Sequence, residues 1–426
     1  MRFNWSSENG VASQTGEWQT SSKMTRVIAM AMSLGLFILI SGKVWIESSS
    51  ARTSQVYIWI LLPALLLMLY GAIKNRGLGL QKHHAPWLAY IAWVALSTLW
   101  AGFDGGEAWK LAKRGIFIVI FLYAIDWLLN HCEAYMRRAI YLGVIVVALG
   151  ALAILIYRIV WLSPNIGYRT FRLDRLGIGD FVNYRYPLAA GLFNGAIATW
   201  AFSAALNERN SPLKAGFWFA VFAVLVVLVF FTYARGAWLG IALAAFLSIL
   251  MANSRRGWWV FGLGALSAVV LSIIWWDHLL AEIFHRKLSG RGPIWDYYFD
   301  VMKGHWLLGY GLGTPFEFHW ADGKTVSPHA HSLFLQQVYD SGIVALALML
   351  TGLCVVACKA WQLRDNEWVK LAVPALAFAI TVMLTDVERI FTRPNDYWTI
   401  FWLPVAIILA IAGKRSGAAA TERSLR

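Results

Sequence analysis

The chain has 426 residues, of which 59% are hydrophobic and only 14% charged, with a formal net charge of +14 and a mean hydropathy of +0.57. This composition excludes an ordinary soluble domain. Apolar runs of about 20 residues, the length that crosses a bilayer, recur along the sequence. The sequence therefore predicts an all-α polytopic membrane protein.

Apolar runs between charged breaks predict twelve transmembrane helices, centred near residues 35, 64, 93, 122, 150, 197, 224, 244, 267, 346, 379 and 405. Lys23 and Arg26 precede the first run, which we interpret as an uncleaved span because eleven more follow. An even number of spans places both termini on one side of the membrane. Lys and Arg in the tails and in alternate connections predict that this side is cytoplasmic.

The predicted organisation has five parts. They are a cytoplasmic tail (1–26), helices one to nine (27–276), a large periplasmic loop (277–332), helices ten to twelve (333–412) and a second cytoplasmic tail (413–426).

Lys and Arg are also present on the side predicted to be outside. The connection 162–187 holds Arg169, Arg172, Arg175 and Arg185, and the loop 277–332 holds Arg286, Lys287, Arg291, Lys303 and Lys324. One interpretation is that these residues meet anionic headgroups of the membrane. The alternative is that the outer face binds an anionic substrate at the membrane surface.

Two nucleotide-dependent chemistries lack their sequence signals. No Asp-x-Asp pair, which would hold a divalent metal against a nucleotide diphosphate, occurs in the sequence. The stretch GKT at 323–325 resembles the end of a phosphate-binding loop, but position 318, where a glycine would be needed, is Phe. A nucleotide-sugar transferase and a nucleotide-driven pump are both disfavoured.

Polar candidates are concentrated in the loop 277–332, which holds six of the nine histidines. Long loops in compact proteins are usually functional or disordered. This one contains two stretches with helical signals, HLLAEIFHRKL (278–288) and PIWDYYFDVMKGHW (293–306), and the second suits a helix lying in the membrane interface. We therefore expect the loop to be functional.

Two arginines are placed to meet an anion. Arg291 lies in the turn LSGRGP just before a predicted helix, whose unpaired N–H groups favour a phosphate. Arg235 lies at the outer tip of a tight hairpin between two apolar runs. The alternative interpretations are a solvated surface arginine for Arg291 and a snorkelling one for Arg235.

The stretch SPHAHSLFLQQVYDSGIV (327–344) places His331 and Ser332 where the loop enters span ten. The dipole of a long helix disfavours imidazolium at its N-terminus, so His331 should be neutral near pH 7 and able to act as a general base. Ser332 would cap the helix. His329 and His331 could instead ligate zinc, although no third ligand is evident.

Together, these features resemble the O-antigen ligase and polymerase superfamily of bacterial inner membranes. The resemblance rests on the apolar spans, the Arg235 hairpin, SGRGP, GYGLG at 309–313 and the His331 stretch. The ligases carry His, then Asn, Ser or Gln, nine residues, Gly, two residues, and Gly, Thr or Tyr. His331, Ser332 and Gly342 fit this pattern, and Ala345 departs from its last position.

The resemblance implies an integral-membrane glycosyltransferase of the O-antigen ligase type. It would transfer a glycan from undecaprenyl pyrophosphate to lipid A-core oligosaccharide at the periplasmic face, with neither metal nor nucleotide. From the residues themselves we expect a direct displacement that inverts the anomeric carbon. No cofactor and no nucleic acid are expected, and the membrane lipids surround the protein. In the family, a His and Arg residues of these regions are essential.

The site assignment combines the residues with the resemblance. His331, Arg291 and Arg235 are the expected catalytic residues, with His331 as the base and the arginines on the diphosphate. Arg175, Arg286, Arg172 and His329 are expected to bind substrate. Two alternatives share the lipid donor, an O-antigen polymerase and a protein O-oligosaccharyltransferase. A transporter of an anionic lipid or solute is a third, although transporters usually place polar residues near the bilayer midplane.

Overall fold

The structure is a computed structural model that describes residues 22–74, 80–102, 105–162, 171–280, 284 and 290–412. The α-helices are α1 (Ser22–Trp45), α2 (Ser49–Val56), α3 (Leu62–Ile73), α4 (Ala85–Leu96), α5 (Gly105–Leu155), α6 (Pro187–Asn207), α7 (Pro212–Thr232), α8 (Arg235–Ala252), α9 (Arg255–Ile274), α10 (Trp276–Leu280), α11 (Arg291–Val301), α12 (Leu333–Gln362), α13 (Glu367–Met383) and α14 (Leu403–Ala410). Short 3₁₀ or π segments are η1 (Tyr57–Leu61), η2 (Lys82–His84), η3 (Ser97–Trp100), η4 (Ile156–Trp161) and η6 (Trp398–Trp402). Strands β1 (Phe318–His319) and β2 (Val326–Ser327) form an antiparallel pair.

The described residues contain eight helices that are long and apolar enough to cross a membrane. This confirms the predicted all-α polytopic class, and every predicted span centre lies within a helix. The number twelve stays a prediction. It differs from eight because α5 covers two predicted spans, and because α4, α13 and the η6–α14 segment are shorter than the others. The two spans in α5 are separated at Cys132, whose backbone is not helical.

Proline explains two of the irregular segments. Pro63 and Pro404 each stand in the first turn of an α-helix, directly after a π-helical turn. Proline has no N–H and cannot continue the regular hydrogen-bond ladder, so the turn before it widens.

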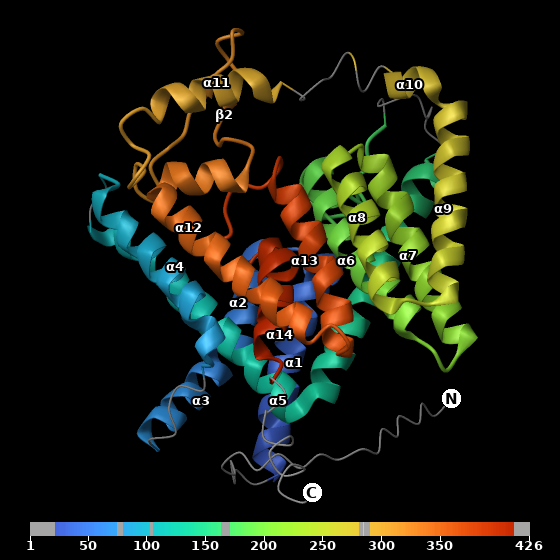
Figure 1. Ribbon diagram of the computed structural model, residues 1–426, viewed down its shortest axis with the longest axis horizontal. Helices are drawn as coiled ribbons and strands as arrows, with labels where there is room; N and C mark the ends of the chain where they lie inside the picture. The colour runs from blue at the N-terminus through green and yellow to red at the C-terminus, as the bar shows by residue number, and fades with distance from the viewer. Residues whose placement is uncertain are drawn as a thin grey trace, which may run out of the picture.

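The helices differ in what surrounds them. α6 is buried on nearly all sides and packs against α7, α8 and α13. Its Gly195, with Gly240 of α8, lets the ring of Phe378 in α13 approach closely. α9 is apolar but almost entirely exposed along one side of the bundle, which is the surface expected of a helix facing lipid. α14 is buried along its whole length, so the core of the molecule lies around α6 and α14 (Figure 1).

Helix α12 is broken at Gly342, where the backbone has φ +75° and ψ 176°. The backbone of residues 306–310 fits into the break: Ile343 N–H donates to the Trp306 carbonyl at 2.8 Å, and Tyr310 N–H donates to the Tyr339 carbonyl at 2.7 Å. The prediction of one long helix after His331 was therefore wrong, because α12 changes direction at Gly342 (Figure 1).

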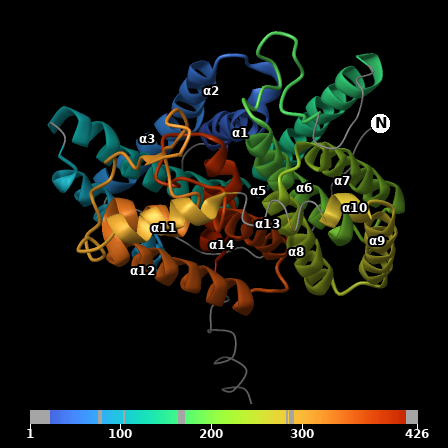
Figure 2. The same cartoon turned by 90° about the horizontal axis from the view of Figure 1, so that it is seen from above.

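The predicted helix in the second half of the loop is confirmed as α11, which begins two residues before Pro293. α11 is joined to the first half of α12 by the Tyr298 hydroxyl, which donates to the Leu335 carbonyl at 2.9 Å, and both helices contribute to one buried apolar cluster. Seen from above, α10 and α11 lie on the same face of the molecule (Figure 2). Most of the predicted helix 278–288 falls outside the described residues.

Candidate functional site

Four segments distant in the sequence converge near the end of the bundle that carries α11 (Figure 1). They are the start of α8, the start of α11, the turn 328–332 before α12, and the connection 384–397 after α13. The first three contain predicted site residues, whereas the fourth was not predicted.

The turn before α12 holds His329 and His331 side by side. Their ring centroids lie 4.1 Å apart, and the His331 backbone N–H donates to His329 Nδ1 at 3.2 Å. His331 has a left-handed backbone with φ +52°, which is unusual for a residue with a Cβ and is found where surrounding structure enforces it. Ser332 stands at the N-cap of α12 as expected, but its side chain makes no capping hydrogen bond.

Both histidines are partly buried, and burial is the main cause that lowers the pKa of each to about 4. The positive charge of Arg291 lowers the pKa of both further, His329 adds to this effect on His331, and Asp386 opposes it there. His331 is therefore neutral near pH 7, in agreement with the prediction. The causes are burial and the neighbouring groups, whereas the prediction rested on the helix dipole.

Arg291 is not a solvated surface residue. Its side chain is only 17% exposed, and it forms an ion pair with Asp386, which is 3% exposed. Its Nε also donates to the Thr385 carbonyl at 2.9 Å. An arginine held at several donors has a fixed orientation, as required of a group that must meet a phosphate at a defined position.

Arg235 begins α8, as the hairpin prediction required. α7 and α8 are joined only by Tyr233, which is left-handed with φ +54°, and Ala234. The next residue, Gly236, lies so close to Asp386 that an added Cβ would come within 2.4 Å of its Oδ2. Asp386 thus lies between the start of α8 and the Arg291 guanidinium, and brings the two predicted arginine regions together.

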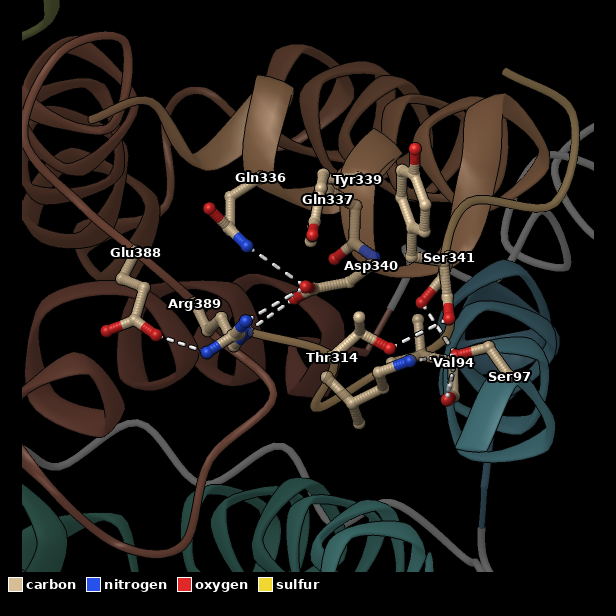
Figure 3. Close-up of polar contacts among 12 residues, drawn as sticks. Val94, Ser97, Thr314, Gln336, Gln337, Tyr339, Asp340, Ser341, Glu388 and Arg389 are labelled. Carbon is tan, nitrogen blue, oxygen red and sulfur yellow. Dashed lines mark hydrogen bonds and ion pairs between the residues drawn. The ribbon is translucent and has the colours of Figure 1, made fainter. Parts of the chain in front are cut away.

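A second buried ion pair joins the 384–397 connection to α12. Arg389 contacts Asp340 through Nε at 2.5 Å and through Nη2 at 2.9 Å, and it also pairs with Glu388. Gln336 donates to the same Asp340 carboxylate at 3.0 Å (Figure 3). The positive charge of Arg389 also contributes, after burial, to lowering the pKa of His329, which places this pair beside the histidine turn.

Arg172 and Arg175, two of the residues expected to bind substrate, make hydrogen bonds within the protein. Arg172 donates through Nε and Nη2 to the Thr232 carbonyl at 2.9 and 2.8 Å, and so holds the end of α7 next to the Arg235 hairpin. Arg175 pairs with Asp174 at 2.7 Å and donates to the Arg185 carbonyl at 3.1 Å. Arg286 lies outside the described residues.

The zinc alternative needs a third ligand beside His329 and His331. Among the residues that the structure describes, no group of three or more His, Cys, Asp or Glu side chains is arranged to hold a metal. The groups next to the two histidines are arginines as well as Asp386, and such a mixed set suits an anionic ligand better than a cation.

Sequence reasoning missed the segment TDVER (385–389) and left Gln336 and Asp340 without a role. A signal was present, because three charged residues follow one apolar span and precede another on the predicted outer side. Ionisable residues at such places are costly and usually functional. Their partners in α11 and α12 could not be identified without the tertiary structure.

The chain is similar to known O-antigen ligases in two comparisons. Residues 220–350 match the family model of the O-antigen ligase. The chain is also 23% identical over 378 residues to an O-antigen ligase of Pseudomonas aeruginosa, covering 89% of this chain and 90% of the relative. The matched family region includes Arg235, Arg291 and His331. Arg291 pairs with Asp386, and the same carboxylate lies beside Gly236 at the start of α8 and acts on His331.

Proposed function

Because the resemblance to the O-antigen ligase and polymerase superfamily is confirmed by both comparisons, we propose that this multi-pass membrane protein is a glycosyltransferase of the O-antigen ligase type. Its donor is a glycan linked to undecaprenyl pyrophosphate, and its acceptor is lipid A-core oligosaccharide. The reaction completes lipopolysaccharide.

One observation carries the proposal. A neutral histidine, His331, lies beside the ion pair of Arg291 and Asp386 at the start of the hairpin helix that begins with Arg235. A base next to oriented cations is the combination that transfer from a lipid diphosphate requires, since the leaving group is already adequate and only its developing charge must be stabilised.

The proposed reaction is a direct displacement with inversion. His331 removes the proton from the acceptor hydroxyl, the hydroxyl oxygen forms a bond to the anomeric carbon, and the bond from that carbon to the pyrophosphate oxygen breaks. The bonding electrons leave with the pyrophosphate, whose charge Arg291 and Arg235 stabilise. An anionic donor bound near His331 also raises the pKa of the imidazole and so makes it a stronger base in the complex.

The same proposal fixes the location. The protein lies in the bacterial inner membrane with both termini in the cytoplasm, and the histidine turn, α11 and the 384–397 connection face the periplasm. The basic cytoplasmic connections support this orientation.

The test is ligation in vitro with purified protein, lipid-linked glycan and lipid A-core, without nucleotide and with a chelator. His331→Ala should lower the rate by about a hundred- to ten-thousand-fold, the usual effect of removing a general base. His319→Ala is the matched control, because this histidine of the same predicted loop is 63% exposed and its side chain lies 3.7 Å from Glu317. Unchanged ligation by a well-expressed His331→Ala protein would falsify the assignment of the base.

The arginines are tested in the same assay. Arg291→Ala should reduce the rate by about a hundred- to a thousand-fold, as expected for a positioned group that stabilises charge. Arg235→Lys keeps the charge but loses the two-pronged geometry that suits phosphate oxygens, and should therefore also be impaired. Full activity of Arg235→Lys would mean that only a positive charge is needed there.

The alternatives predict different products. A polymerase lengthens the lipid-linked glycan without lipid A-core, and a protein O-oligosaccharyltransferase glycosylates a protein. A transporter forms no glycosidic bond. Product analysis with intact donor and folded wild-type protein therefore separates all of them from the ligase.

A further inference from the structure

The backbone of Ala330, between His329 and His331, is held from two sides. Its N–H donates to Gln336 Oε1 at 3.0 Å, and its carbonyl accepts from Trp295 Nε1 at 3.0 Å. Ala330 itself is fully buried. Gln336 comes from α12 and Trp295 from α11, so two separate helices fix one peptide segment between the two histidines.

Gln336 is in turn fixed by the buried ion pair. Its Nε2 donates to Asp340, one turn further along α12, at 3.0 Å. Asp340 in turn accepts hydrogen bonds from two nitrogens of Arg389. Gln336 is fully buried and Asp340 is 2% exposed. Since the amide both accepts from Ala330 and donates to Asp340, it cannot rotate without breaking one of the two hydrogen bonds. A chain of contacts therefore runs from Arg389 through Asp340 and Gln336 to Ala330 in the histidine turn. Figure 3 shows its part from Arg389 to Gln336.

The conformation of the turn explains why such a restraint is needed. The left-handed backbone of His331 is unfavourable for a residue with a Cβ and persists only where neighbouring groups determine it. If the Ala330 peptide were released, His331 could relax toward a common conformation and its ring would move away from the arginines.

We propose that Gln336 and Trp295 are positioning residues for His331, and that the Asp340–Arg389 pair acts through Gln336. This inference rests on the proposed role of His331 as the base. The two residues set the place and direction of the imidazole, and they act on the transfer step through His331.

The position of a general base affects chemistry more than binding. A displacement of about 1 Å from the productive geometry can cost about a hundred-fold in rate. Gln336→Met, which removes both hydrogen bonds at similar volume, should thus lower kcat by about a hundred-fold while the KM values for donor and acceptor stay unchanged. Trp295→Phe, which keeps an aromatic ring but loses the N–H, should lower kcat in the same way by a smaller factor.

Gln337→Met is the matched control. Gln337 is the next residue of the same helix, is also buried, and accepts a hydrogen bond from Tyr90 of α4. The Gln337→Met variant therefore loses a buried hydrogen bond of a similar kind, but this bond does not involve the histidine turn. Its kcat should be close to that of the wild type, even if its thermal stability falls as much as that of Gln336→Met.

A double variant gives the decisive readout. If Gln336 acts through His331, Gln336→Met should cause no further loss in a His331→Ala background, whereas a general structural defect would lower the residual rate again. Wild-type kcat in Gln336→Met, or an equal loss in Gln337→Met, overturns the inference. If Gln336→Met does not fold, wild-type kcat in Trp295→Phe overturns it instead.

The failure of this inference can be told from failure of the proposed function. An inactive His331→Ala protein with a fully active Gln336→Met protein leaves the base in place and removes only the positioning role. A fully active His331→Ala protein removes both.

Discussion

At the scale of single residues, the charges of the candidate site are paired with one another. Arg291 is held by Asp386, and Arg389 by Asp340 and Glu388. Buried ion pairs are poor contributors to stability, because desolvation offsets much of their attraction, but removing one partner leaves an uncompensated charge. We interpret these pairs as devices that fix the orientation of the arginines rather than as sources of stability.

The lowered pKa of His331 gives the reaction a characteristic pH dependence. Burial first, then His329 and Arg291, lower its pKa to about 4, so the base of the free enzyme stays unprotonated down to that pH. We expect kcat/KM to be nearly constant from neutral pH to about pH 5 and to fall only near pH 4, rather than near the ordinary histidine value of about 6.5. A pH–rate profile of the purified protein measures this.

The same shift links stability to pH. The folded-state pKa of His329 and of His331 lies below the unfolded value, so the unfolded chain binds these protons first as the pH falls. Their contribution to stability is present above about pH 6.5 and is lost toward pH 4. The melting temperature should therefore fall less on acidification in a His329→Gln/His331→Gln double variant than in the wild type. An equal fall of the melting temperature in the double variant and in the wild type would contradict the lowered pKa of the two histidines.

At the scale of elements, the break in α12 determines how the site is built. The first nine residues of α12, before Gly342, include Gln336 and Asp340 and share a buried cluster with α11. The residues after Gly342 continue as an apolar helix. Ser341 and Ser97, whose hydroxyls lie 2.8 Å apart, join the break to η3, and the Leu312 N–H donates to Ser97 at 3.2 Å. The broken helix thus connects the GYGLG stretch to the histidine turn.

Gly342→Ala should disrupt this connection. The backbone at φ +75° and ψ 176° is accessible essentially to glycine alone, and an added Cβ would lie 2.0 Å from the Leu307 carbonyl oxygen. The conformational strain alone costs about 1–3 kcal/mol, and the clash adds to it. We expect a clear loss of thermal stability in detergent together with loss of ligation.

Gly264→Ala is the control for this variant. Nothing lies within 4 Å of a Cβ built at Gly264 in the exposed helix α9. Alanine is the better helix former by up to about 1 kcal/mol, so this variant should be as stable as the wild type or slightly more so. Equal stability of Gly342→Ala and the wild type would show that the break does not depend on glycine.

At the scale of the whole molecule, the proposed orientation separates two exposed residues. Lys324, in the turn between β1 and β2, should face the periplasm, and Arg209, between α6 and α7, should face the cytoplasm. In a background without the three native cysteines, Lys324→Cys should react with a membrane-impermeant thiol reagent in spheroplasts, and Arg209→Cys should react only after lysis. The reverse pattern would invert the topology and place the histidine turn in the cytoplasm.

Part of the fold and of the site could be predicted because it is encoded locally. Apolar runs identify the helices without knowledge of their neighbours, and the short link at Tyr233 and Ala234 fixes the hairpin that presents Arg235. The histidine stretch was recognisable from its residue types and spacing. Asp386 and Arg389 were missed because a charged residue between two spans shows its importance only through its partners.

The sequence by itself therefore determined that the chain is a helical membrane protein and that His331, Arg291 and Arg235 are its candidate residues, since hydrophobic length and motif spacing are properties of neighbouring positions. Only the tertiary structure decided that Arg291 pairs with Asp386, that α12 breaks at Gly342, and that Gln336 and Trp295 hold the peptide beside His331. The physical reason is that buried hydrogen bonds and ion pairs join segments far apart in the chain, and their geometry exists only after the helices have packed.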